Sequence, residues 1–162
     1  ADSAKRGIVE LSDMMRHVVY ESTADQIPLS RDIEFLKNYI ELMRIRYSQT
    51  IDIRFNYPQN LLPTIVIPPL VMIVFVENAF KHGISYNHRS FINIEVMEQG
   101  DNLVCIVENS RHYAQAATKH SGIGLSNIKK RLQLLYADNF SLTTDNTETD
   151  VYRIKLVIPK IR

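Results

Sequence analysis

The chain has 162 residues, of which 45% are hydrophobic and 23% are charged, and its net charge is +1. A chain of this length forms one domain, or one domain with an appendage, and it can bury a core. The balanced charge, without a run of lysines or arginines, argues against nucleic-acid binding, and no apolar run approaches the roughly 20 residues needed to span a bilayer.

The first 47 residues carry two helical patterns. Apolar residues recur every three or four positions over 4–20 and again, after the polar stretch ESTADQIPLS (21–30), over 33–43. Ser30 is the expected cap of the second helix, and Asp32 lies in its first turn, where the helix dipole favours an acid. The two patterns predict an N-terminal helical hairpin.

After Tyr47 the pattern changes to the period of two that is typical of half-buried strands. Alternation marks TIDIRFNY (50–57), FINIEVM (91–97), LVCIV (103–107), FSLTT (140–144) and VYRIKLVIP (151–159), and the last two flank a turn-rich segment, as in a hairpin. Helices are predicted from about 69 to 82 and from about 124 to 136. The single cysteine, Cys105, is expected to be a buried thiol. The fold class is therefore α+β, with a helical segment at 1–48 and a sandwich of one sheet and a few helices at 49–162.

The octapeptide VENAFKHG (76–83) places four polar side chains at the end of an apolar helix. Glu77, Asn78, Lys81 and His82 share one arc of the helix, opposite its apolar side chains. An asparagine oxygen can bind Mg²⁺, and the two potential cations can meet phosphate oxygens. The alternative is an ordinary polar helix end.

A second unusual stretch is HSGIGLSNIKKRLQLLY (120–136), which holds two of the five glycines, Gly122 and Gly124, just before a predicted helix. Glycines let a backbone approach a ligand closely, and the amides at a helix N-terminus favour anions. The same spacing also fits a flexible entry to a helix.

The stretches PLVMIVFVENAFKHG and SGIGLSNIKKRL resemble the N box and the second glycine box of sensor histidine kinases of the LytS/YehU type. Upstream, LSDMMRHVV (11–19) and PLSRDIEFLKNYIELMRIRY (28–47) resemble further segments of that family. The resemblance implies an ATP-binding domain of the GHKL superfamily, shared with gyrase, Hsp90 and MutL. Its fold is the Bergerat-type two-layer sandwich, in which helices cover one face of a mixed, mostly antiparallel sheet.

The resemblance also implies a role for each matching residue. Asn78 matches the Mg²⁺-binding asparagine, and Lys81 and His82 match positions that face the phosphates of ATP. Glu77 matches the acid that orients a water in the ATPase relatives and that helps the phosphoacceptor histidine in the kinases. The turn from the lid to the following helix, around the phosphates, is matched by Gly122, Ile123, Gly124 and Leu125.

The sequence departs from the family at the adenine contact. The family has an aspartate there, at the end of the strand before the lid, whereas this strand ends in VENSRHY. Asn109 aligns with the aspartate, and Glu108 is its neighbour. Because successive residues of a strand point to opposite faces, one of the two faces the pocket, and Asn109 is favoured. An uncharged asparagine predicts weaker nucleotide binding than an aspartate.

The second departure concerns the phosphoacceptor histidine. The family carries it in an HFLFN-like motif upstream of LSxxLRY, and no such motif occurs here. His17 stands at the usual tyrosine of LRY and is expected to be an ordinary helix-surface residue. The chain is also expected to be a fragment that starts after the phosphoacceptor helix.

The leading interpretation is the cytoplasmic catalytic region of a bacterial inner-membrane two-component sensor kinase, an enzyme that uses ATP and Mg²⁺. The resemblance implies a homodimer in the full-length protein and a response regulator, of the LytTR type, as phosphate receiver. Nucleic acid is not an expected partner, and a membrane is one only through parts outside this chain. The alternatives are a degenerate kinase core that acts as a nucleotide-binding or scaffolding module, which Asn109 favours, and a stand-alone ATPase with Glu77 as base.

Overall fold

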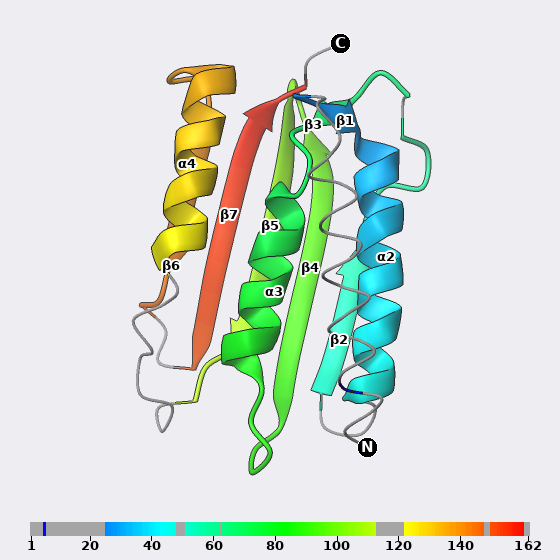
Figure 1. Cartoon of the computed structure of the whole chain (residues 1–162), viewed down its shortest axis with the longest axis vertical. Helices are drawn as coiled ribbons and strands as arrows, with labels where there is room; N and C mark the ends of the chain where they lie inside the picture. Colours follow the sequence, from blue (N-terminus) through cyan, green and yellow to red (C-terminus); the bar gives the residue numbers. More distant parts are fainter. Residues whose placement is uncertain are drawn as a thin grey trace.

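The computed structural model describes residues 5, 25–47, 51–61, 63–112, 122–147 and 150–160. In this part of the chain, three helices cover one face of a five-stranded sheet (Figure 1). They are α2 (Leu29–Arg46), α3 (Val71–Gly83) and α4 (Gly122–Tyr136), and α3 lies between the other two. The predicted α+β sandwich is confirmed, whereas the predicted helix at 4–20, the first arm of the hairpin, lies outside the described residues. Among the described helices none has both the length and the apolar character needed to cross a membrane.

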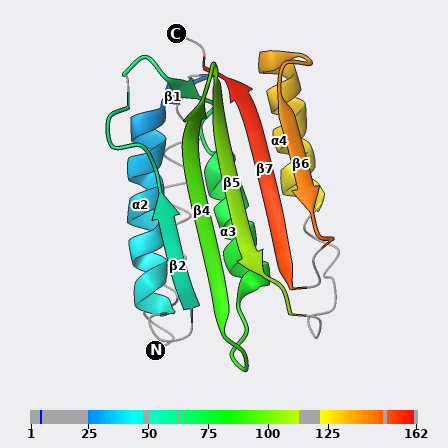
Figure 2. The same ribbon diagram turned by 180° about the vertical axis from the view of Figure 1, so that it is seen from behind.

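The strands of the sheet lie in the order β2-β4-β5-β7-β6 (Figure 2). Their bounds are Ile51–Asn56 for β2, Ser90–Gln99 for β4, Asn102–Ser110 for β5, Ser141–Asp145 for β6 and Val151–Pro159 for β7. The pairing of β2 with β4 is parallel, and the other three pairings are antiparallel. This agrees with the mixed, mostly antiparallel sheet that the family resemblance implies, and with the predicted β6–β7 hairpin.

A short antiparallel ribbon, which the sequence did not predict, precedes two of the helices. It pairs β1 (Ile27–Pro28) with β3 (Val66–Ile67). The backbone N–H of Leu29 donates to the carbonyl of Ile65 at 2.9 Å, so the ribbon satisfies the first amide of α2. The prediction that Ser30 caps α2 is therefore wrong: Pro28 stands at the N-cap, and Ser30 lies inside the helix.

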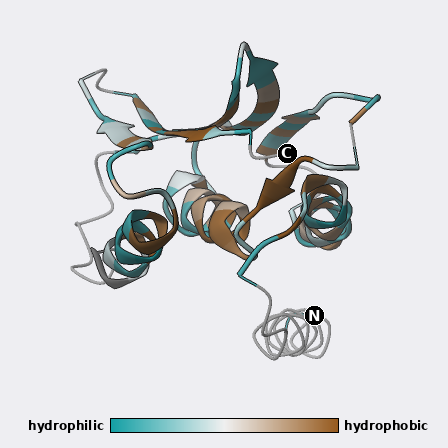
Figure 3. Ribbon diagram, turned by 90° about the horizontal axis from the view of Figure 1, so that it is seen from above, coloured by the Kyte–Doolittle hydropathy of each residue, from teal (hydrophilic) through white to brown (hydrophobic). Residues whose placement is uncertain are grey.

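The core lies between the sheet and the helical layer, and the central helix α3 consists mostly of hydrophobic residues (Figure 3). Cys105 of β5 is 2% exposed, with its Sγ 3.4 Å from Sδ of Met72, and burial raises the pKa of this thiol. The buried thiol is therefore confirmed. The same core includes six buried residues of α2, which are Leu29, Ile33, Leu36, Tyr39, Ile40 and Met43. The domain boundary at 48 stays a prediction, although α2 shares one core with the sheet.

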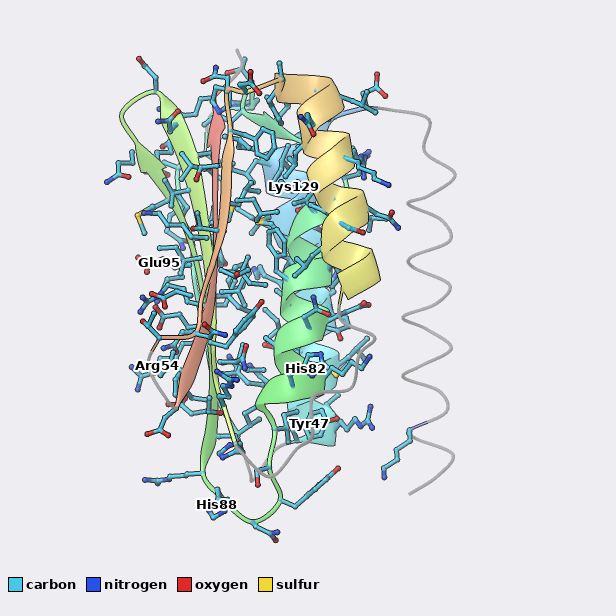
Figure 4. All side chains as sticks on the ribbon, turned by 90° about the vertical axis from the view of Figure 1, so that its left-hand side faces the viewer. Tyr47, Arg54, His82, His88, Glu95 and Lys129 are labelled. Atoms are coloured by element: carbon cyan, nitrogen blue, oxygen red, sulfur yellow. The ribbon has the colours of Figure 1, made fainter. Side chains whose placement is uncertain are left out.

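The opposite face of the sheet carries charged side chains. Figure 4 shows Arg54 and Glu95 on this open face and His82 on the helical side. Glu108 lies on the open face as well, where its carboxylate accepts a hydrogen bond from Nε of Arg153 at 2.6 Å. The two faces of the sheet therefore differ in chemistry, as the period of two in the strands predicts.

Candidate functional site

The polar face of α3 lies where the sequence predicted it. The opposite side of the helix is anchored in the core through Met72, Ile73, Phe75, Val76, Ala79 and Phe80, each at most 5% exposed. In the last two turns, Glu77, Asn78 and His82 are half-buried, and Lys81 is exposed. Because the apolar side is fixed against the sheet, the rotation of α3 is fixed, and the four polar side chains emerge as one group.

The first turn of α4 lies beside α3. A Cβ added to Gly124 would lie 3.4 Å from Cγ1 of Val74, so the two helices approach closely at this point. Val74 and Asn78 are one helical turn apart and share a face of α3, which places Asn78 on the side towards α4. The C-terminal end of α3 and the N-terminal end of α4 point to the same end of the molecule (Figure 1).

The glycine turn itself differs slightly from the prediction. Helix α4 begins at Gly122, about two residues earlier than predicted, so Gly122, Ile123, Gly124 and Leu125 form its first turn and do not precede it. The first amides of a helix have no partner within the helix, so this turn offers donors to an anion.

Asn109 occupies the helix-covered face of the sheet. It is 3% exposed, and a Cβ added to Gly83 would lie only 2.8 Å from its Cβ. The close approach explains why a glycine follows the polar face of α3. The Asn109 Nδ2 donates to the carbonyl of Ser110 at 2.9 Å, while no described residue donates a hydrogen bond to its Oδ1. Glu108 lies on the open face with Arg153, so Asn109 is the one of the two residues on the helical side, and its contact with adenine stays a prediction.

Ser110 is a residue of this region that the sequence did not point to. Its hydroxyl donates to the carbonyl of Gly83 at 2.8 Å and accepts from the backbone N–H of Phe91 at 3.0 Å. These bonds tie the end of α3 to β4 and β5, so they hold Asn109 and the polar face of α3 in a fixed relation. A lone serine at the end of a strand carries no sequence signal for such a role.

His82 carries an unsatisfied polar atom. Its Nε2 is buried and has no hydrogen-bond partner among the described residues. Burial lowers the pKa of His82, and the charge of Lys81 lowers it further, so both favour the neutral ring. A buried polar atom without a partner costs about 1–3 kcal/mol, and a ligand with an acceptor or donor in this place would offset that cost.

Other predicted features fall outside the described residues. These are His17, residues 113–121 of the lid predicted at about 110–121, and the side chain of Ile123. Next to the lid, the Nε2 of His112 lies 3.2 Å from the Ser90 hydroxyl, and its ring stacks on that of His88 with 5.6 Å between centroids.

Comparison with known proteins supports the resemblance. A family model described as "Histidine kinase" matches residues 1–51. The chain is 26% identical over 163 residues to the sensor protein LytS of Oceanobacillus iheyensis. The aligned part is 91% of this chain and 28% of that protein. It is also 26% identical to the sensor histidine kinase BtsS of Escherichia coli, over 82% of this chain and 24% of BtsS. The chain thus spans about a quarter of the curated relatives it matches, and its resemblance to LytS-type sensor histidine kinases is confirmed.

Solved structures confirm the fold. The catalytic domain of histidine kinase ThkA superposes with a TM-score of 0.59, at 19% identity, over 83% of this chain and 94% of that domain. The histidine kinase domain of the blue-light activated kinase EL346 of Erythrobacter litoralis also has a TM-score of 0.59, at 14% identity, over 86% of this chain and 70% of that one. At these identities the likeness concerns the fold.

Proposed function

We propose that this chain is the ATP-binding catalytic region of a two-component sensor histidine kinase. The observation that carries the proposal is the unpartnered Nε2 of His82, next to Asn78 and Lys81 on the face of α3 that adjoins the first turn of α4. The kinase relatives favour this function over a degenerate scaffold or a stand-alone ATPase. The proposal includes a histidine upstream of this chain as phosphoacceptor, a response regulator of the LytTR type, a homodimer, and a cytoplasmic location beneath the inner membrane.

The residues fit Mg²⁺ held jointly with a polyphosphate. Among the described residues, no group of three or more histidine, cysteine or acidic side chains can hold a metal. Mg²⁺ does not need such a cage, because it keeps several waters and takes oxygens from substrate phosphates together with one or two protein ligands. The half-buried Asn78 would supply the protein oxygen. When bound, the ion would neutralise charge on the phosphates.

The remaining side chains would position the nucleotide. Lys81, the Nε2 of His82 and the amides of the first turn of α4 would meet phosphate oxygens, and the Oδ1 of Asn109 would accept the adenine amino group. Glu77 would orient the imidazole of the phosphoacceptor. Since phosphoryl transfer depends on positioning and charge stabilisation, the fixed rotation of α3 is the main contribution of the fold.

Replacing Asn78 by alanine is expected to remove most of the Mg²⁺ dependence of ATP binding while the fold persists, because Asn78 lies on the polar side of α3. Titration with a fluorescent ATP analogue, with and without Mg²⁺, measures the effect. Asn38→Ala, at an exposed position on α2, is the matched control. Equal affinity of the parent chain for ATP with and without Mg²⁺ would rule out the metal role.

Replacing Asn109 by alanine is expected to weaken binding of the same analogue about 10-fold, the loss of one to two hydrogen bonds in a buried place. Glu108→Ala removes a partner of Arg153 on the open face and is expected to leave the affinity unchanged. The reverse ranking of the two variants would show that the adenine contact is misassigned.

A further inference from the structure

The segment that leads into α3 has an unusual conformation. Leu70, the N-cap residue of α3, has φ 67° and ψ 11°, and no side chain caps the helix there. This left-handed conformation costs a non-glycine residue about 1–2 kcal/mol, so other contacts must hold it in place.

Two side chains from two other helices hold the peptide group before Leu70. Nη1 of Arg131, on α4, donates to the carbonyl of Pro69 at 2.6 Å. The carboxyl of Asp32, in the first turn of α2, accepts a hydrogen bond from the backbone N–H of Leu70. The carbonyl of Pro69 and the N–H of Leu70 belong to one peptide group. An acid from one neighbouring helix and a cation from the other therefore hold its two ends, and we call this arrangement the clasp.

The clasp lies in the apolar interior. Asp32 is 2% exposed, and its Oδ2 has no hydrogen-bond partner among the described residues. Burial raises the pKa of Asp32 to about 7, while the Leu70 N–H and the charge of Arg131 lower it. The thiol of Cys105, on β5, is the other titratable group that interacts with this carboxyl. A polar network in such surroundings favours one arrangement of the elements that supply it, because any other leaves polar groups unpaired.

The clasp and the candidate site lie at opposite ends of α3. Leu70 precedes the helix, whereas Asn78 and His82 lie in its last two turns. On α4, Arg131 follows Gly124 by about 10 Å along the axis at 1.5 Å per residue. Figure 1 shows all three helices side by side, with the start of α2 near the start of α3. The clasp thus joins α2 to both helices of the site without including a site residue.

We propose that Asp32 and Arg131 are positioning residues that hold α3 against α4 for nucleotide binding and transmit the binding of nucleotide to α2. This inference rests on the proposed function. If α4 moves when its first turn binds phosphates, Arg131 moves the Pro69–Leu70 peptide, and Asp32 carries the displacement into α2. In the sequence, α2 follows residues 11–19, which resemble the LSxxLRY segment that comes after the phosphoacceptor motif in the family.

The test uses the whole chain with isoleucine methyl groups labelled for NMR, titrated with Mg·ATP. Ile33 and Ile40 report on the buried side of α2, and Ile84, next to Gly83, reports on occupancy of the site. The variants are Asp32→Ala, which removes the acceptor, and Arg131→Gln, with Arg131→Lys as the conservative replacement that keeps the charge. Glu34→Gln and Lys130→Gln, at exposed positions on the same two helices, are the controls.

In the parent chain, the controls and Arg131→Lys, the signals of Ile33, Ile40 and Ile84 are expected to shift together. In Asp32→Ala and Arg131→Gln, Ile84 is expected to shift at saturation while the α2 signals keep less than about half of their response. Affinity for Mg·ATP is expected to fall about 5-fold, a typical coupling between sites, and the double variant is expected to bind no more weakly than either single one.

The outcomes separate this inference from the function on which it rests. If the parent chain binds Mg·ATP but the α2 signals stay unmoved, the clasp proposal is wrong and the proposed function stands. The same holds if both variants keep the full α2 response. A parent chain that does not bind Mg·ATP at all would overturn both.

Discussion

Replacing Asp32 by asparagine is expected to flatten the dependence of the free energy of unfolding on pH. Burial raises the pKa of this carboxyl from 3.8 to about 7 in the folded chain. Between these two values the folded state keeps a proton that the unfolded state releases, so stability is present below the unfolded pKa and is lost as pH rises through 7. From about pH 5 to about pH 8 the parent chain is expected to lose about 2–3 kcal/mol through this one group.

Urea unfolding at a series of pH values measures the effect as the difference between the parent chain and Asp32→Asn. Glu34→Gln, an exposed replacement two residues along the same helix, is expected to follow the parent. Arg131→Gln removes the charge that lowers the pKa of Asp32, and it is expected to extend the fall in stability to higher pH. Identical pH profiles for the parent and Asp32→Asn would contradict the assignment of this group.

Replacing Glu77 by glutamine is expected to slow histidine phosphorylation about 100-fold in a longer chain that includes the proposed upstream phosphoacceptor. An acid that orients and polarises the accepting group acts mainly in the transition state and contributes about 10²-fold or more. The affinity for ATP is expected to change less than about 3-fold, since the phosphates are held by other groups. The rate of acid-labile labelling from γ-labelled ATP measures the first effect, and analogue titration measures the second.

Glu95→Gln is the matched control, because Glu95 lies on the open face of the sheet, away from α3 (Figure 4). The 162-residue chain itself is expected to stay unlabelled on histidine, as no histidine stands in the acceptor motif of the family. Labelling of this chain that is lost in His17→Gln would overturn that expectation. A longer chain that binds ATP and stays unlabelled would favour the degenerate-scaffold interpretation.

Much of the fold was predictable because its signals are local. The period of two in 103–107 and 151–159 depends on neighbours along the chain, and β5 and β7 appear there. The wide apolar side of α3 and the short polar face at 77–82 follow from helical geometry alone. In the structure, the side chains of the apolar side are buried, as this geometry predicts. The order of the strands and the β1–β3 ribbon join residues distant in sequence, so no local pattern contained them.

The candidate site also has a part that the sequence predicts and a part that only packing decides. The family resemblance limited the proposed adenine contact to Asn109 or its neighbour Glu108, and the fold then placed Asn109 against Gly83 on the helical side. The link of Ser110 to the carbonyl of Gly83 depends on the packing of β5 beneath the end of α3, across 27 positions of sequence. The sequence therefore predicted the residue types of the candidate site, and packing determined which of them lie close together.

Asp32 shows the division most clearly. By itself the sequence determined that an acid stands in the first turn of a helix, where the dipole of the helix favours it. Only the tertiary structure decided that this acid is buried and that it shares one peptide group with Arg131, which lies 62 positions from Pro69. The physical reason is that periodicity and capping report interactions within about one turn or one strand, whereas the surroundings of a buried charge are assembled from separate elements when the core closes.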